Sequence, residues 1–173
     1  KEGFYIDVGA NYPTVDSVTK VFYDMGWSGI NIEPIKSLYL KLEKLRSRDI
    51  NLNIGLGSKE GTAVFREYTD MPGHSTFEQS QKDVHHINFK DYTVRISTLD
   101  EIFVEHRIKH VDFLKVDVEG YEQEVVKGNN WSKNRPKVLC IEANHSISST
   151  ESWKNIVESN NYKLFIADGL NEY

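Results

Sequence analysis

The sequence contains a single cysteine, Cys140, so it cannot form a disulfide bond within the chain. Cys140 lies in the apolar run at residues 138–141. We therefore interpret its side chain as a small buried hydrophobic group rather than as a catalytic thiol. Nothing in the cysteine content requires an oxidising compartment.

Long hydrophobic runs are also absent, and no apolar stretch has the length needed to span a bilayer. We therefore predict no membrane segment in this chain. The first residues, Lys1-Glu2-Gly3, lack the pattern of a signal peptide. Because the chain begins without Met, we expect it to be a fragment of a longer protein, in which a targeting or transmembrane segment could lie elsewhere.

Positive charge is not in excess, since 21 Lys and Arg residues face 26 Asp and Glu residues, for a formal net charge of −5. Domains that bind duplex nucleic acid usually carry a basic face, so we predict no nucleic-acid partner. The 173 residues are 39% hydrophobic and 27% charged, which is ordinary for a folded domain. We expect one domain over residues 1–173.

The first third of the chain alternates between two apolar patterns. Residues 4–8, 29–33 and 50–54 are short apolar runs that predict buried strands. Residues 13–25 and 35–45 between them repeat apolar side chains at helical spacing. This β-α-β-α-β order predicts a parallel sheet with right-handed crossovers.

The middle of the chain has a different character. Residues 62–68 and 92–97 predict two more strands, which flank a long polar segment at residues 69–90. We interpret that segment as a lid or substrate loop. The alternation then returns, with helices near 99–106, 120–127 and 151–159 and strands at 111–118, 137–143 and 162–167. The whole pattern predicts an α/β fold: a mostly parallel sheet with helices on both faces and a β insertion.

The first candidate site residues are Asp7, Gly9 and Asn11, at the end of the first strand. In open parallel sheets, ligands bind beyond the carboxyl ends of the strands. A glycine there lets the backbone approach a ligand closely, and Asp7 can orient the turn or accept from an ammonium group. A plain strand-to-helix turn is the alternative interpretation.

Glu33 ends the second strand, about two dozen residues after Gly9. Dinucleotide-binding folds place an acidic residue here, because a carboxylate can accept hydrogen bonds from both ribose hydroxyls. The full glycine pattern of NAD-binding proteins is absent, since only Gly9 matches it. The pair therefore favours an adenosine cofactor without a pyrophosphate. A surface Glu ahead of a proline turn is the alternative.

Asp117 and Glu119 follow the strand at residues 111–118 and precede a helix. Paired carboxylates at such a place can position a hydroxyl, act as a base or hold a divalent ion. Acidity at a helix N-terminus is also favourable in itself, which is the bland alternative. We interpret Lys115 as a partner of these acids rather than as a catalytic amine.

Glu142, Asn144 and His145 end the next strand and project at the same edge of the sheet. His145 can accept a proton from a substrate hydroxyl, because imidazole titrates near neutral pH. A solvent-exposed histidine is an equally weighted alternative. The run Gly-His-Ser-Thr at residues 73–76 is a rival source of a base or of substrate contacts. We interpret the histidine pair at 85–86 as a solvated part of the loop.

Together these segments resemble the FkbM family of methyltransferases. The similar pieces occur in the family's order, and they are residues 4–11, 31–34, 98–100, 113–122 and 141–143. The run Lys-Val-Asp-Val-Glu-Gly-Tyr-Glu is the most specific of them. Residues 168–171 also resemble the tail of an FkbM branch that is often found beside or fused to glycosyltransferases.

The resemblance implies a Rossmann-like class I methyltransferase fold, S-adenosylmethionine as the methyl donor, and O-methylation of a sugar, glycan or polyketide hydroxyl. It implies a small-molecule or glycan acceptor and a fused or associated glycosyltransferase as partner. The antiparallel seventh strand of such folds could begin only around residues 172–173. We expect a cytoplasmic location from the cofactor supply and the lone cysteine.

By the same resemblance, Asp7, Gly9 and Asn11 would contact the methionine part of the cofactor. Glu33 would hold the ribose, Pro34 would border the adenine, and Gly55 would line the adenine site. The departure from the family is at residues 11–13, Asn-Tyr-Pro, where many relatives have a second glycine. This departure affects the detailed contacts more than the identity of the cofactor.

For the reaction, we favour a mechanism without a metal, in which His145 is the base, Asp117 orients the acceptor and Glu119 lies beside it. The alternative is Mg²⁺ held by Asp117, Glu142 and Asn144. Two other classes of function compete. One is a non-catalytic Rossmann-like interaction domain in a glycan-synthesis protein, and the other is an NAD-dependent oxidoreductase, against which the thin glycine pattern counts.

Overall fold

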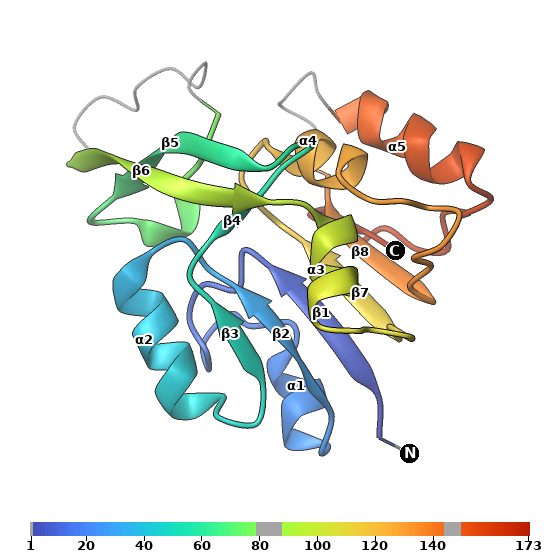
Figure 1. Cartoon of the computed structure of the whole chain (residues 1–173), viewed down its shortest axis with the longest axis horizontal. Coiled ribbons are helices and arrows are strands. Elements are labelled where there is room, and N and C mark those ends of the chain that lie inside the picture. The colour runs from blue at the N-terminus through green and yellow to red at the C-terminus, as the bar shows by residue number, and fades with distance from the viewer. Residues whose placement is uncertain (1, 79–87, 144–149) are drawn as a thin grey trace.

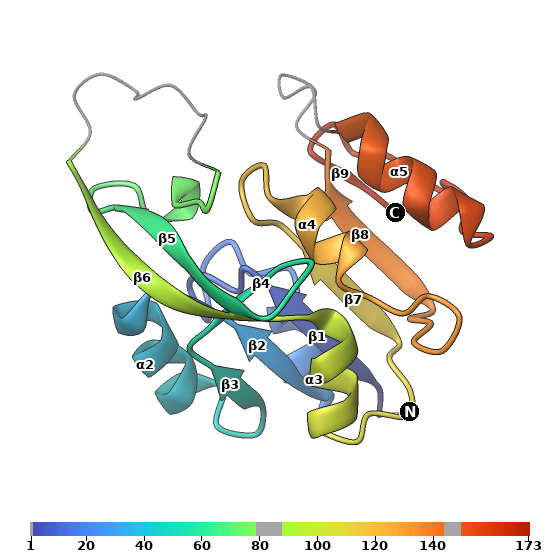
Figure 2. The same ribbon diagram turned by 45° about the horizontal axis from the view of Figure 1, so that its top comes forward.

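The computed structural model describes residues 2–78, 88–143 and 150–173. Its main element is a six-stranded sheet in the order β3-β2-β1-β7-β8-β9 (Figures 1 and 2). The first five strands pair in parallel, and β9 pairs antiparallel with β8. The strands are β1 (Phe4–Val8), β2 (Ser28–Ile32), β3 (Ile50–Leu52), β7 (Phe113–Val116), β8 (Val138–Glu142) and β9 (Asn171–Glu172). The predicted mostly parallel α/β sheet is confirmed.

The strand order reverses between β1 and β7. The chain first adds strands outward from β1 to β3, and after the insertion it returns to the other side of β1 with β7 and β8. In open α/β sheets, the crevice at such a reversal is where ligands bind, because the two neighbouring connections leave in opposite directions. This topology predicts the site at the carboxyl ends of β1 and β7.

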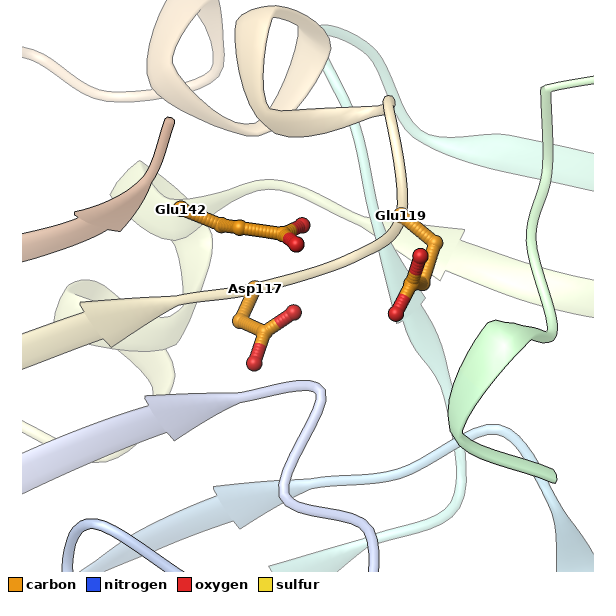
Figure 3. Close-up of side chains that lie close together, drawn as sticks. All are labelled: Asp117, Glu119 and Glu142. Carbon is orange, nitrogen blue, oxygen red and sulfur yellow. The ribbon is translucent and has the colours of Figure 1, made fainter. Parts of the chain in front are cut away.

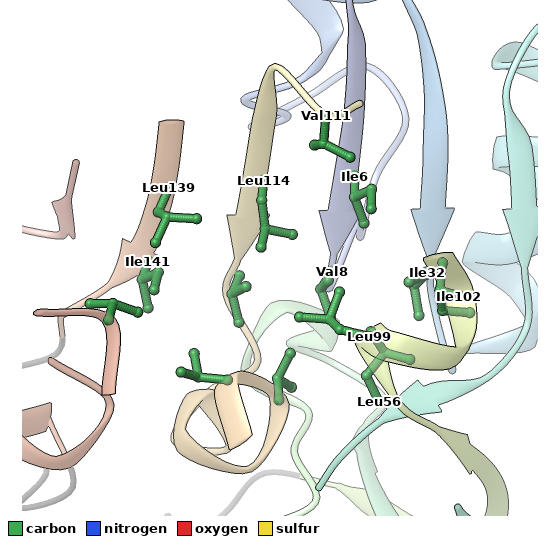
Figure 4. Close-up of a cluster of buried hydrophobic side chains, with 14 of the residues drawn as sticks. Ile6, Val8, Ile32, Leu56, Leu99, Ile102, Val111, Leu114, Leu139 and Ile141 are labelled. Atoms are coloured by element: carbon green, nitrogen blue, oxygen red, sulfur yellow. The ribbon is translucent and has the colours of Figure 1, made fainter. Parts of the chain in front are cut away.

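Helices cover both faces of the sheet, as predicted. On one face, α3 (Leu99–Glu105), α4 (Glu122–Lys127) and α5 (Thr150–Ser159) pack on the main apolar cluster, part of which is drawn in Figure 4. On the other face, the short helix α1 (Lys20–Asp24) and its flanking residues cover Cys140 and its neighbours. Cys140 is fully buried, as predicted, and burial raises the pKa of its thiol to about 11. Within the described part of the chain, no helix has both the length and the apolar character needed to cross a membrane.

A second, three-stranded sheet forms the predicted β insertion. It contains β4 (Gly55–Leu56), β5 (Gly61–Tyr68) and β6 (Phe89–Ser97) in the order β4-β6-β5, and the 3-10 helix η1 (Pro72–His74) follows β5. Figures 1 and 2 show this sheet on the side toward which β1 and β2 point. The helix α2 (Lys36–Leu45) packs against it through Leu38. Residues 79–87 of the predicted lid lie outside the described residues.

The predicted helix at residues 13–25 is wrong over most of its length, because only Lys20–Asp24 is helical. The reason is the buried side chain of Arg46 in α2's C-cap. Its guanidinium donates to the Pro13 carbonyl at 2.9 Å and to the Ser17 hydroxyl at 2.8 Å. Asp16 accordingly adopts a left-handed conformation with φ of 54°. The segment folds around a cation that lies far away in sequence rather than into a helix.

The predicted strand at residues 162–167 is also wrong, since only Ala167 forms an isolated bridge, with Glu172. Its neighbour β9 contains two residues, so this segment has little strand to pair with. Phe165 donates its N–H to the Tyr173 carbonyl at 2.7 Å, yet its side chain is 90% exposed. A two-residue antiparallel strand, β9, forms at Asn171–Glu172, close to residues 172–173, where such a strand could begin.

Gly9 offers a stability test of the point where β1 and β7 meet. Its φ is 77°, and a Cβ at this position would lie 1.9 Å from the Asp117 carbonyl oxygen. We expect Gly9→Ala to lower the free energy of unfolding by about 2–4 kcal/mol, from left-handed strain and overpacking together. Chemical denaturation followed by circular dichroism measures this.

The matched control is Gly26→Ala, at a φ of 93° with no atom within 4 Å of the added methyl. This variant introduces backbone strain without overpacking, so we expect its free energy of unfolding to fall by about 1–2 kcal/mol. Equal losses for the two variants would contradict the close packing of the β1 turn against Asp117.

Candidate active site

A pocket lies at the carboxyl ends of β1, β2 and β7, and part of its lining comes from the insertion. Seven of the predicted site residues line it: Gly9, Asn11, Glu33, Pro34, Gly55, Asp117 and Glu119. They come from four separate stretches of the chain, which the sheet order brings together at one edge. The structure therefore gathers most of the predicted site residues around one cavity.

The β1 turn presents backbone and side-chain groups to this pocket. The Gly9 and Ala10 N–H groups both donate to the Ile32 carbonyl, at 3.0 and 3.1 Å, which ties the turn to β2. Asn11 has a left-handed φ of 52°. Among the residues that the structure describes, its buried Oδ1 has no hydrogen-bond partner. A buried acceptor without a partner is costly, so this atom fits a ligand donor such as an ammonium group.

Glu33 is almost completely buried, with 4% of its surface exposed. Its Oε2 accepts from the Asn11 N–H at 2.8 Å, and its Oε1 accepts from the Ile35 N–H at 2.7 Å. Burial outweighs these hydrogen bonds and raises the pKa of the carboxyl to about 7. Each carboxylate oxygen can accept a further hydrogen bond. Glu33 therefore holds the two turns in place and still fits a diol such as the ribose of an adenosine cofactor.

Asp7 does not belong to the pocket lining. It is 1% exposed, and its Oδ2 accepts from the Thr19 hydroxyl at 2.6 Å. Its Oδ1 lies 3.4 Å from the Lys115 ammonium. Asp7 lies behind the β1 turn and supports it. This position does not favour the predicted direct contact between Asp7 and the cofactor.

Lys115 is a partner of the acids, as predicted. Its Nζ donates to the Gly9 carbonyl at 2.8 Å and lies 3.2 Å from Asp117 Oδ2. Burial alone would lower the pKa of its ammonium, but the Asp7 and Asp117 carboxylates raise it above its usual range. Lys115 is therefore a permanent cation rather than a source of a free amine.

Three carboxylates meet beside the pocket: Asp117, Glu119 and Glu142 each offer an oxygen within 4.8 Å of the others. Figure 3 shows Asp117 directly after the end of β7, Glu142 at the end of β8, and Glu119 on the loop that leads to α4. Burial and then the charge of Asp117 raise the pKa of Glu119 to about 7 and that of Glu142 to about 8. Near neutral pH, Glu119 and Glu142 are therefore partly protonated and can both donate to and accept from hydroxyl groups.

The same trio has the donor set of a divalent cation site, with oxygen ligands from three side chains. Two of the three predicted ligands, Asp117 and Glu142, belong to this cluster, and the third, Asn144, lies outside the described residues. The Lys115 ammonium lies beside Asp117 and would repel a bound cation. A reaction without a metal stays our prediction for this site.

The predicted base His145 lies outside the described residues, as do His85 and His86. The rival histidine, His74 of η1, has its Nδ1 3.7 Å from Glu119 Oε2. The insertion is held against Glu119, because the Thr76 hydroxyl donates to the Glu119 carbonyl at 2.8 Å. Glu119 is held with a left-handed φ of 54°, a strained conformation that often marks functional sites.

The insertion also supplies pocket residues that no sequence motif indicates. Phe65 and Phe77 line the pocket and lie 4.6 Å apart between ring centroids. A Cβ on Gly55 would reach 2.4 Å from the Phe77 ring, so the glycine makes room for this aromatic wall. Phe77 lies in the segment at residues 69–90 that we interpret as a lid or substrate loop, whereas Phe65 lies in a predicted strand to which no site role was assigned.

Comparison with known proteins agrees with this architecture. A crystal structure of methyltransferase FkbM from Methylobacillus flagellatus KT superposes with a TM-score of 0.59 and 19% sequence identity. The match covers 91% of this chain and 37% of that protein, so at this identity it concerns the fold of a part of that protein. No match was found among curated protein sequences. The family model for the methyltransferase FkbM domain matches residues 7–164, and the chain belongs to this methyltransferase family.

Proposed function

We propose that this domain is an S-adenosylmethionine-dependent O-methyltransferase that methylates a hydroxyl of a sugar or glycan. The observation that carries the proposal is a single pocket at the strand-order reversal. It joins a buried carboxylate, Glu33, and an unsatisfied acceptor, Asn11 Oδ1, to the acidic trio. Glu33 suits the ribose of an adenosine, and Asn11 Oδ1 suits the ammonium of an amino-acid moiety. The acidic trio suits a polyhydroxyl acceptor.

The cofactor side of the pocket follows from the donors and acceptors that are present. Glu33 would accept from the ribose hydroxyls, and Asn11 Oδ1 from the ammonium of the methionine part. Pro34 and Gly55 border the same cavity and offer no charge, which suits an adenine ring. Only Gly9 matches the glycine pattern that lets backbone N–H groups approach a pyrophosphate, which argues against NAD.

On the acceptor side, partly protonated carboxylates suit a neutral sugar. Glu119 and Glu142 can hydrogen-bond to hydroxyls in either direction, whereas an anionic acceptor would meet like charge. Asp117 is the member of the trio that contacts the Lys115 ammonium, and it would orient the reacting oxygen. We further propose that a glycosyltransferase, fused or associated, prepares the acceptor. The cytoplasmic location stays a prediction from the cofactor supply.

For the proton, we retain His145 as the proposed base, with Asp117 and Glu119 as orienting groups. S-adenosylmethionine, when bound, supplies the methyl group as a sulfonium electrophile. The residues of the chain must align an acceptor oxygen, exclude water and take up its proton. His74 is a second candidate base, because its Nδ1 faces the Glu119 carboxylate and its side chain is 58% exposed.

Calorimetric titration with S-adenosylhomocysteine tests the cofactor. We expect the wild-type domain to bind it and not NAD. Glu33→Gln should weaken binding by about 10- to 100-fold, because the variant loses hydrogen bonds to a charged acceptor. Glu43→Gln on the exposed side of α2 is the matched control and should bind like the wild type. Binding of neither ligand would instead favour the non-catalytic interaction domain.

The same titration predicts a pH dependence with a defined sign. Burial raises the pKa of Glu33 to about 7 in the free protein, and hydroxyl donors from a ligand would lower it. Binding should therefore strengthen as the pH rises from about 6 to 8 and release protons at pH 7. Titrations in buffers of different ionisation enthalpy measure this release. Proton release that is undiminished in Glu33→Gln would contradict this role.

A methyl-transfer assay on a panel of methyl glycosides tests the chemistry. We expect His145→Ala to lower turnover by about 10²-fold or more, which is typical for loss of a general base. His110→Ala should leave turnover unchanged, because His110 pairs with Asp112 at the opposite end of β7. Turnover should survive a strong chelator.

Undiminished turnover in His145→Ala, with a loss in His74→Ala, would transfer the role of base to the insertion. Loss of turnover in the chelator that added Mg²⁺ restores would establish the metal alternative at the acidic trio.

A further inference from the structure

Lys115 is a buried lysine at the strand-order reversal, and its contacts join two strands. It is the residue of β7 that pairs with Asp7 of β1, and its side chain is 7% exposed. The ammonium lies within 3.4 Å of three acceptors, namely the Gly9 carbonyl at 2.8 Å, Asp117 Oδ2 at 3.2 Å and Asp7 Oδ1 at 3.4 Å. One cation therefore holds the ends of both strands.

The contact with Gly9 fixes the turn that lines the pocket. On the β2 side, the Gly9 N–H donates to the Ile32 carbonyl. On the β7 side, the Gly9 carbonyl accepts from Lys115, and the Asp117 N–H donates to the Val8 carbonyl at 3.1 Å. The turn is thus restrained from both neighbouring strands. Without the ammonium, the Gly9 carbonyl and the buried Asp7 carboxylate would lose their shared partner.

The charge of Lys115 also acts on the pocket. It lowers the pKa of both Glu33 and Glu119 against the opposing effect of burial. Asp117 and Glu119 line the cavity directly, so its acceptor side carries negative charge that Lys115 partly offsets. Charge this close and this buried is weakly screened by salt.

We propose that Lys115 is a positioning residue of the cofactor site, which fixes the Gly9 turn and sets how strongly the site favours a sulfonium cation over a neutral thioether. The inference rests on the proposed function. A lysine that only stabilised the fold would change the binding of both cofactor forms by the same factor. A lysine that also sets the local charge would change their ratio.

The experiment compares S-adenosylmethionine and S-adenosylhomocysteine, titrated at pH 8 into wild-type and variant domains. We expect Lys115→Met to weaken both by about 10-fold, because the Gly9 turn loses a charged donor. The sulfonium form should lose less, since a nearby positive charge has been removed. The ratio of the thioether Kd to the sulfonium Kd should rise by about 3-fold or more.

Asp117→Asn should move this ratio in the opposite direction, because it removes a negative charge from the same cluster. Asp117 is 35% exposed, so this variant tests the charge effect even where Lys115→Met does not fold. Lys115→Arg keeps the charge and should keep the wild-type ratio. The control is Lys154→Met, which breaks a more exposed ion pair with Glu172 at the edge of the sheet and should leave the ratio unchanged.

An unchanged ratio in folded Lys115→Met, or a shift in the same direction for Lys115→Met and Asp117→Asn, would overturn the inference while the proposed function stood. If wild-type protein bound neither form, the proposed function would fail first, and the inference with it. The two failures are therefore distinguished by the wild-type titration.

Discussion

The parallel pairing of β1 with β7 is the constraint on which the rest of the site depends. These strands are distant in sequence, and they meet where the strand order reverses. Their exits are packed so closely that the carbonyl of Asp117 occupies the space of a Cβ on Gly9. Only glycine fits this turn, because the left-handed backbone and the contact both exclude a side chain. The β1 turn on the proposed cofactor side and Asp117 of the acidic trio are therefore in direct contact, so neither can move without the other.

A layer of buried polar groups beneath the turn explains why several residues support the pocket without lining it. Arg46 and Asp49 form an ion pair with both side chains inaccessible to solvent, and Tyr5 hydrogen-bonds to each of them. The Thr19 hydroxyl continues this network to Asp7. Removing one partner of a buried pair leaves an uncompensated charge, so such groups constrain each other strongly. Residues 13–19 pack around this network instead of forming a helix, and the network supports the end of β1.

The sequence was informative wherever a local pattern decides the structure. Short apolar runs located the strands, and polar residues directly after them located Glu33 and Asp117 in one pocket. The two wrong elements depended on distant partners. Arg46 is 33 residues from Pro13, and the segment at 162–167 depends on pairing with β9. Thr76, 43 residues from the Glu119 carbonyl that it binds, likewise left no local signal. Hydrophobic periodicity indicates which face of a helix or strand is apolar, but it does not indicate which other element packs on that face.

The insertion makes the two halves of the pocket interdependent. A Cβ on Gly73 would lie 3.2 Å from Asn11 Nδ2, so η1 lies against the cofactor turn. Three residues later, Thr76 holds the backbone of Glu119, and His74 faces its carboxylate. One short segment therefore contacts both the proposed cofactor side and the acidic trio. A shift of this segment would alter the binding of donor and acceptor together. Because methyl transfer needs both reacting atoms aligned at once, such a shared wall is a direct physical way to couple their positions.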